Sequence, residues 1–99
     1  MKNTRGYQER FILVGKNAIV TGAVGILGRH FCEGLAEAGA NVAVVDLDHD
    51  TCVDFANELA GKYGIRSIGV SCDITVEDSV AGMVKKIASD LGDFDILHN

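Results

Sequence analysis

The sequence predicts an α/β fold in which parallel strands alternate with helices to form a doubly wound sheet. Two short apolar runs, residues 18–20 and 42–45, lack polar alternation, as is typical of strands covered on both faces. Apolar residues after these runs recur at helical spacing, and glycines stand where strands give way to helices. Strands and helices in this alternation form parallel sheets with right-handed crossovers and helices on both faces. Such folds bind ligands beyond the carboxyl ends of their strands.

The first predicted strand, residues 18–20, runs directly into a turn that carries Gly22, Gly25 and Gly28. A strand that passes through a glycine turn into a helix leaves several backbone N–H groups aimed at one spot, backed by the helix dipole. One glycine serves the tight turn, one the close approach of a phosphate and one the packing of helix on strand. We therefore expect an anionic ligand here, and the pyrophosphate of a dinucleotide is the best candidate. The alternative is a glycine turn with a purely architectural role.

The second predicted strand, residues 41–46, ends in Asp46, which follows Gly22 by 24 residues. In dinucleotide-binding folds an acidic residue about 20 residues after the glycines meets the adenosine ribose. Asp46 could accept from both ribose hydroxyls, whereas a 2′-phosphate there would face a like charge, so NAD is preferred and NADP is less favoured. Alternatively, Asp46 only opens an acidic loop and caps the next helix. Both can hold, because Asp48 or Asp50 is better placed as the N-cap.

Residues 52–71 are predicted to form a helix followed by a strand. The helix carries an apolar stripe at offsets 0, 3, 4, 7, 8 and 11, made of Cys52, Phe55, Ala56, Leu59, Ala60 and Tyr63. Gly61 and Gly64 mark the expected end of this helix. The short, partly apolar run 67–71 is the third predicted strand.

The last predicted helix opens at Thr75, which with Asp78 resembles a capping box. Its apolar face consists of Val76, Val80, Met83, Val84, Ile87 and Leu91. Gly92 ends it, and residues 94–98 start a fourth strand. Asp73, just after the third strand, falls at the same edge of the sheet as the glycine turn and Asp46, so one elongated ligand could touch all three.

At this point the sequence resembles the short-chain dehydrogenase/reductase family over roughly residues 11–99. The matching segments are Gly15-Lys16, the motif Thr21-Gly22-x-x-Gly25-x-x-Gly28, Asp46, Cys72-Asp73-Ile74-Thr75 and Asp95-Ile96-Leu97-His98-Asn99. The resemblance implies part of a Rossmann-type fold, with four strands in the order 3-2-1-4.

The resemblance also implies a role for each part of the cofactor site. The glycine turn, including Ile26 and Leu27, would hold the pyrophosphate; Asp46 with Leu47 would hold the adenosine ribose; and Asp73 with Ile74 would contact the adenine. Asn99 matches the first asparagine of the family's Asn-Asn-Ala-Gly element, which steadies the central sheet and lines the cofactor cleft.

Two positions depart from the family pattern. The middle glycine, Gly25, comes one position earlier than in most members and is followed by Ile26 and Leu27, a spacing found in a minority and in the extended branch, so the subfamily stays open. His98 stands where an aliphatic residue is usual. We expect it to be packed or partly solvated and assign it no chemistry.

The chain contains no catalytic Tyr-x-x-x-Lys pair, the element that the resemblance implies for hydride transfer. The only tyrosines are Tyr7 and Tyr63, and the residues four positions on are Phe11 and Ser67. We therefore expect no catalytic residue within residues 1–99 and no activity of this chain alone. The chain is expected to be the amino-terminal part of a single dinucleotide-binding domain, preceded by a polar leader at residues 1–10.

The amino-acid composition and charge argue against two classes of partner, nucleic acid and membrane. A net charge of −5 and a pI near 4.9 argue against a nucleic-acid-binding surface. The absence of an 18-residue apolar run argues against a membrane span, and the polar leader lacks the apolar core of a signal peptide, so cytoplasm is the default.

The three cysteines, Cys32, Cys52 and Cys72, lie 20 residues apart and form no Cys-x-x-Cys pair. This spacing predicts reduced, buried thiols and no metal site. His30 and Cys32, two apart on a helix, point to different sides and cannot share a metal.

The function predicted is the cofactor-binding portion of an oxidoreductase that transfers hydride between NAD and a small alcohol or ketone. A homo-oligomer is expected. The 99-residue chain alone is expected to dimerise, exchange elements or aggregate, because its fourth strand would leave an open, partly apolar edge. One alternative is a nucleotide-binding or structural module without turnover. Another is a methyltransferase-like or nucleotide-sugar-modifying relative.

Overall fold

The structure, a computed structural model, describes residues 13–99, so the predicted leader and Tyr7 lie outside the described residues. Within this range, strands and helices alternate as β1 (Asn17–Thr21), α2 (Ile26–Glu37), β2 (Asn41–Asp46), α3 (His49–Tyr63), β3 (Ser67–Ser71), α4 (Glu77–Asp90) and β4 (Ile96–His98). The four strands form one sheet in the order β3-β2-β1-β4, and every neighbouring pair is parallel. The predicted fold class and strand order are confirmed.

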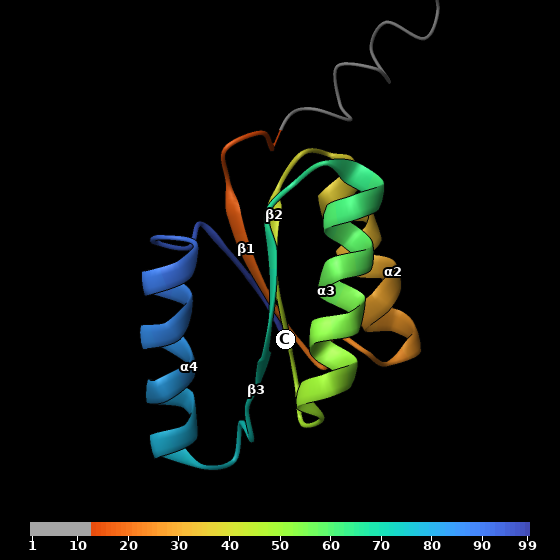
Figure 1. Cartoon of the computed structure of the whole chain (residues 1–99). Coiled ribbons are helices and arrows are strands. Elements are labelled where there is room, and N and C mark those ends of the chain that lie inside the picture. The colour runs from red at the N-terminus through yellow and green to blue at the C-terminus, as the bar shows by residue number, and fades with distance from the viewer. Residues whose placement is uncertain (1–12) are drawn as a thin grey trace, which may run out of the picture.

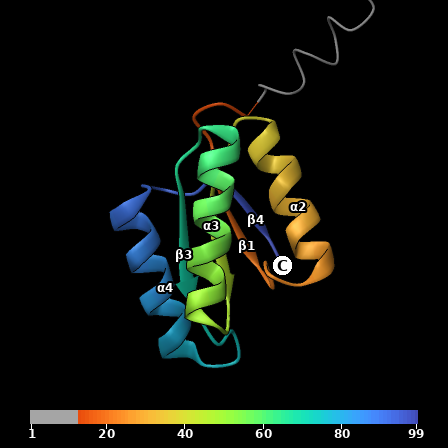
Figure 2. The ribbon, with the colours of Figure 1, turned by 45° about the vertical axis from the view of Figure 1, so that its right-hand side comes forward.

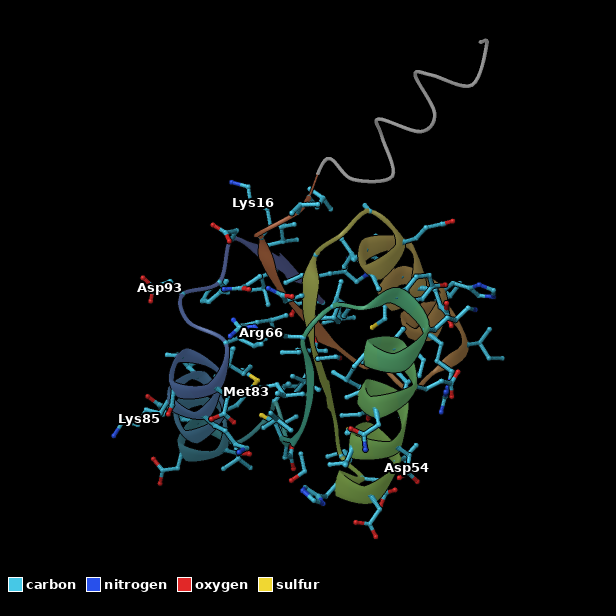
Figure 3. All side chains as sticks on the ribbon, turned by 45° about the horizontal axis from the view of Figure 1, so that its top comes forward. Lys16, Asp54, Arg66, Met83, Lys85 and Asp93 are labelled. Atoms are coloured by element: carbon cyan, nitrogen blue, oxygen red, sulfur yellow. The ribbon has the colours of Figure 1, made fainter. Side chains whose placement is uncertain are left out.

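The sheet is the middle of three layers. Figure 1 shows α2 and α3 on one face and α4 alone on the other, and the turned view in Figure 2 brings α3 in front of the sheet. Figure 3 shows Met83 on the sheet side of α4 and Lys85 on the opposite side. Helices on both faces are what a doubly wound sheet requires.

Burial on both faces explains why the central strands show no polar alternation. Val20 of β1 and Val42 and Val44 of β2 belong to the apolar core under α2 and α3. Ile19 of β1 and Val45 of β2 belong to the second core, under α4. Each of these side chains is at most 1% exposed, and burial of an aliphatic side chain of this size contributes about 1.5–3 kcal/mol. The two central strands therefore hold both layers of helices.

Helix α3 matches its predicted apolar stripe. Cys52, Phe55 and Leu59 are buried against the sheet and α2. Asp48 is the N-cap, and Gly64, with φ +70°, is the C-cap. Gly61, predicted to mark the end together with Gly64, instead lies inside the helix, where an added Cβ would meet no atom within 4 Å.

The start of α4 differs from the prediction. The capping box of Thr75 and Asp78 does not form, because the Thr75 hydroxyl instead donates to Asp73 Oδ1 at 2.6 Å, and Val76 is the N-cap residue without a side-chain hydrogen bond. Asp78 lies in the first turn of α4, where its negative charge interacts favourably with the helix dipole.

The apolar face of α4 is narrower than predicted. Met83, Ile87 and Leu91 are buried, whereas Val76 and Val84 are 46% and 40% exposed, because α4 is the one helix on its face in the described part of the chain. The fourth strand is also shorter than the predicted run 94–98 and begins at Ile96.

Candidate functional site

The glycine turn, Asp46 and Asp73 meet at the carboxyl edge of the sheet, as their places after β1, β2 and β3 require. A pocket of about 230 Å³ opens there. It is lined by Gly22, Val45, Asp46, Leu47, Cys72, Asp73, Ile74 and Thr75. Residues from three separate parts of the sequence therefore form one hollow next to the glycine turn.

Two backbone features shape the glycine turn: the conformation of Gly22 and the close packing of Gly28. Gly22 adopts φ +65°, a left-handed conformation that other residues rarely take, and its carbonyl accepts from Gly25 N–H at 3.2 Å. A Cβ on Gly28 would overlap the Gly22 carbonyl oxygen and lie 2.8 Å from Ala23 Cα. The first turn of α2 therefore rests directly on the backbone of the preceding loop.

The amino end of α2 is open. Gly25 is its N-cap, no side chain caps it, and no acidic residue stands in its first turn. A helix end of this kind has unsatisfied N–H groups and a positive dipole end, which together suit an anion. Ile26 and Leu27 are 81% and 79% exposed, so their side chains lie at the surface beside this helix end.

The Asp46 carboxylate faces the glycine turn and does not cap α3. Its Oδ1 accepts from Leu47 N–H at 2.8 Å, and its Oδ2 accepts from Val24 N–H at 3.1 Å. The N-cap of α3 is Asp48, whose Oδ2 accepts from Thr51 N–H at 3.0 Å. Hydrogen bonds from Thr51 hold the pKa of Asp48 below its ordinary value. Capping of α3 is therefore not the role of Asp46.

Asp73 organises the loop after β3. Its Oδ1 accepts from both the hydroxyl and the N–H of Thr75, and these bonds lower the pKa of the carboxyl group. Ser79 Oγ accepts from Asp73 N–H at 3.0 Å. Ile74 and Leu47, 60% and 69% exposed, add apolar surface to the pocket lining.

Asn99 lies apart from this pocket, at the end of β4 and beside β1. The Thr21 hydroxyl lies 3.2 Å from Asn99 Oδ1 and 3.4 Å from the His98 carbonyl, both of which can accept from it. Thr21, which is 8% exposed, thus joins the last residue of β1 to the residues that end β4.

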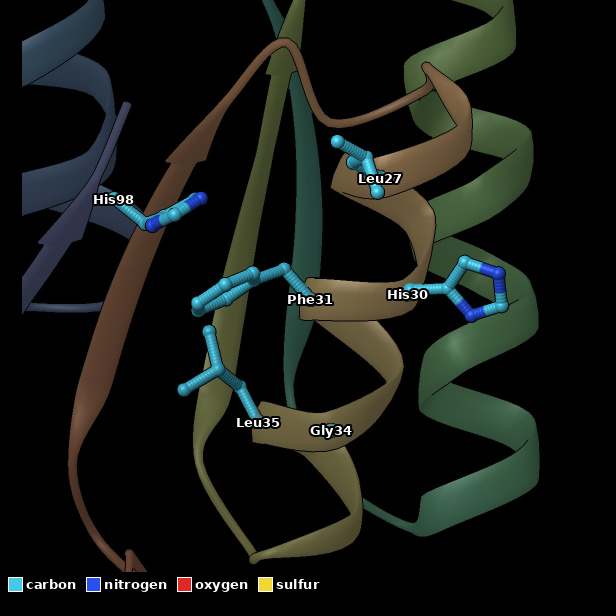
Figure 4. Close-up of a pocket in the computed structure, with 6 residues that line it drawn as sticks. All are labelled: Leu27, His30, Phe31, Gly34, Leu35 and His98. Atoms are coloured by element: carbon cyan, nitrogen blue, oxygen red, sulfur yellow. The ribbon is translucent and has the colours of Figure 1, made fainter.

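A larger groove, of about 520 Å³, lies between α2 and β4. Its lining is Leu27, His30, Phe31, Gly34, Leu35 and His98. Figure 4 shows Phe31 and Leu35 pointing from α2 toward β4, while His30 points the other way. His98 stacks on Phe31 with ring centroids 3.6 Å apart, so it is packed, as predicted. The groove holds no acidic side chain and does not include Asp46, so we place the candidate site in the smaller pocket.

Tyr63 is not arranged for proton transfer. Its hydroxyl donates to Glu33, and Lys62 Nζ lies 3.3 Å from the same Glu33 oxygen. The hydrogen bond to Glu33 raises the pKa of Tyr63, the reverse of what a tyrosine needs to act as an acid and base near neutral pH. This cluster joins α2 to α3 at the protein surface.

The cysteines match the prediction of buried thiols. All three are buried and unpaired, and burial raises the pKa of Cys32 to about 12. Residues 13–99 contain no group of histidine, cysteine or acidic side chains that could hold a metal ion. In the same range, no helix has the length and apolar character needed to cross a membrane.

Two features of the site were missed at the level of sequence. The bond from Val24 N–H to Asp46 joins two residues 22 apart, and Val45, Cys72 and Thr75 contribute to the pocket lining. The bond could not be foreseen, because the donor is a backbone group that carries no residue-type signal. Cys72 directly precedes Asp73, and that adjacency was the available signal.

Comparisons with known proteins agree with this geometry. The sequence model of the short chain dehydrogenase family matches residues 16–99. A short chain dehydrogenase/reductase of Aspergillus oryzae, astE, is 36% identical over 94 residues, which cover 95% of this chain and 36% of that protein. The chain thus spans about a third of the length of the relatives that it matches.

Solved structures show the same fold. L-sorbose reductase from Gluconobacter frateurii, complexed with NADPH and L-sorbose, superposes with a TM-score of 0.81 at 32% identity, over 86% of this chain and 32% of the reductase. An NAD⁺-bound xylitol dehydrogenase superposes with a TM-score of 0.80 at 30% identity, over 86% of this chain and 32% of the dehydrogenase. With its strand order, its glycine turn and the family match, the chain belongs to the short-chain dehydrogenase/reductase family, whose members are NAD(P)-dependent oxidoreductases.

The contact between Gly28 and the turn can be tested with two alanine variants of α2. We expect Gly28→Ala to lower the free energy of unfolding by about 1–3 kcal/mol, because a Cβ overlaps backbone atoms that can yield only by moving the turn. Gly34→Ala is the matched control, since a Cβ there meets open space and alanine favours a helix by about 0.5–1 kcal/mol. Urea unfolding followed by circular dichroism measures both. Equal shifts for the two variants would contradict the close contact.

Proposed function

We propose that residues 1–99 form the amino-terminal part of a single dinucleotide-binding domain and bind the adenosine and pyrophosphate portion of NAD. The longer protein to which we propose this chain belongs would transfer hydride between NAD and a small alcohol or ketone. One observation carries the proposal: the Asp46 carboxylate stands at the end of β2, next to a helix amino end that carries neither a side-chain cap nor an acidic residue. This pairing offers an acceptor for ribose hydroxyls beside donors for phosphate oxygens.

Each portion of the cofactor has a proposed set of partners. The proposed contacts are Gly22, Gly25, Ile26, Leu27 and Gly28 for the pyrophosphate, Asp46 and Leu47 for the adenosine ribose, Asp73 and Ile74 for the adenine, and Asn99 for the cleft beyond β4. The open amino end of α2 and the pocket shared by Gly22, Asp46 and Asp73 support this assignment. Bound NAD would supply the hydride-accepting ring, while the residues of this chain bind and orient its other half.

The preference for NAD over NADP rests on charge. No basic side chain lines the pocket, and two of its lining residues, Asp46 and Asp73, are acidic. A 2′-phosphate placed at Asp46 would meet a like charge with no arginine or lysine in the lining to compensate it. Relatives do not decide the preference, because one similar structure holds NADPH and another NAD⁺.

We expect Asp46→Ala to weaken NAD by about 10- to 100-fold, the loss expected when hydrogen bonds from ribose to a carboxylate disappear. NADP should lose less, because the substitution also removes a like charge. Calorimetric titration of both cofactors measures the difference. Asp50→Ala is the control, since Asp50 is a nearby carboxylate in the first turn of α3 whose side chain is 93% exposed and bonds to His49. Equal losses for NAD and NADP would contradict the charge argument.

The 99-residue chain is expected to bind cofactor without turnover. It carries no Tyr-x-x-x-Lys pair, and Tyr63 is bound to Glu33 with a raised pKa. Purified chain mixed with NAD and an alcohol, or with NADH and a ketone, should give no change in absorbance at 340 nm above background. A cofactor-dependent change that Gly28→Trp abolishes would show that the chain itself is catalytic.

We also propose that the protein is cytoplasmic, because its three cysteines are unpaired and buried, as is usual in a reducing compartment. A small molecule, and neither nucleic acid nor membrane, is its proposed partner besides the cofactor, given the net charge of −5.

For the 99-residue chain on its own, association into a homo-oligomer is proposed from the open side of β4. Within the described residues β4 pairs only with β1, and Leu97 and Phe31 are 53% and 46% exposed along that side. Unpaired strand edges and adjoining apolar surface favour association. We expect light scattering on the purified 99-residue chain at high micromolar concentration to give a mass above that of one chain. A monodisperse monomer would contradict this expectation.

A further inference from the structure

The hydrogen bond between Asp46 and Val24 helps to fix the glycine turn to the end of β2. Two bonds tie the turn to the end of β2: Ala23 N–H donates to the Val45 carbonyl at 3.1 Å, and Val24 N–H donates to Asp46 Oδ2 at 3.1 Å. Gly25, the next residue, is the N-cap of α2. The second bond therefore holds the last turn residue before the helix end that faces the proposed pyrophosphate.

We propose that Asp46 is a positioning residue for the glycine turn as well as a ribose acceptor, an inference that rests on the proposed function. Each oxygen of an ionised carboxylate can accept about two hydrogen bonds. Oδ1 accepts from Leu47 N–H and Oδ2 from Val24 N–H, which leaves each oxygen one site for a hydroxyl of the adenosine ribose. One carboxylate thus holds the turn before cofactor arrives and accepts the ribose afterwards.

The two roles of Asp46 have opposite signatures for a ligand that lacks ribose hydroxyls. If Asp46 acts on the ribose alone, removing its charge leaves the binding of such a phosphate ligand unchanged or slightly tighter, because a repulsion disappears. If Asp46 also positions the turn, losing the bond to Val24 makes the ligand order the turn itself, and binding weakens.

The probes are ADP and 2′,3′-dideoxy-ADP, which differ only in the hydroxyls of the ribose. We expect Asp46→Ala to weaken the binding of dideoxy-ADP by about three- to tenfold, the size expected for the net loss of one ordinary intramolecular hydrogen bond, and to weaken the binding of ADP further. Asp46→Asn keeps one acceptor oxygen, which can serve Val24 N–H only while the amide NH2 faces Leu47 N–H, so it should restore part of the lost dideoxy-ADP affinity. Asp50→Ala removes a nearby charge from the first turn of α3 and should weaken the binding of neither ligand. Unchanged or tighter binding of dideoxy-ADP by Asp46→Ala would overturn the positioning role.

A second readout needs no ligand. Hydrogen exchange of the Val24 amide, followed by NMR on the free protein, should accelerate at least fivefold in Asp46→Ala, accelerate less in Asp46→Asn and stay near the rate of the unsubstituted chain in Asp50→Ala. Unchanged exchange in Asp46→Ala would overturn the positioning role even if ADP binds. If exchange accelerates in Asp46→Ala but ADP fails to bind the unsubstituted 99-residue chain, the positioning contact stands and the proposed cofactor function fails. The two ideas are therefore tested separately.

Discussion

The parallel pairing of β1 with β2 is the constraint on which the rest of the structure depends. Its register runs from Asn17 opposite Asn41 to Thr21 opposite Val45, so both strands end at the same edge of the sheet. This register makes the turn after β1 a neighbour of Asp46 at the end of β2. No contact between their side chains is needed to bring them together. The same pairing buries both faces of both strands, which is why α2 and α3 must cover one face and α4 the other.

The opposite edge of the sheet is closed by amide side chains. Asn41 Nδ2 donates to Asn17 Oδ1 at 3.0 Å, and Asn17 Nδ2 donates to the carbonyls of Leu91 and Asp93 at the end of α4. Arg66 adds a bond to the Leu91 carbonyl at 2.8 Å. These groups satisfy the strand starts and the α4 terminus locally, and they contribute nothing to the pocket. Polar groups at one edge thus stabilise the fold, while the carboxylates of Asp46 and Asp73 at the other edge line the pocket.

Patterns that burial imposes could be predicted from sequence, whereas bonds between backbone and distant side chains could not. The alternation of buried strands with helices and the α3 stripe follow from apolar spacing, whereas the strand order was implied by the resemblance to the family and not by that spacing. The loop after β3 was misjudged because Thr75 can bond either forward to the helix or back to Asp73, and residue type alone does not separate the two. For the site, the edge on which Asp46 lies was predictable, but its bond to Val24 was not.

If Asp46 serves both turn and ribose, cofactor preference and turn geometry are not independent in this chain. Replacing the carboxylate by a small neutral residue would relieve repulsion of a 2′-phosphate, yet it would also release Val24 N–H from its acceptor. A switch toward NADP would therefore need a second group to hold the turn, besides a positive charge for the phosphate. The side chain of the neighbouring residue, Leu47, can supply neither, because it is exposed but apolar and carries neither a hydrogen-bond acceptor nor a charge. The proposed preference for NAD would thus be tied to the contact that holds Val24, the residue before the N-cap of α2.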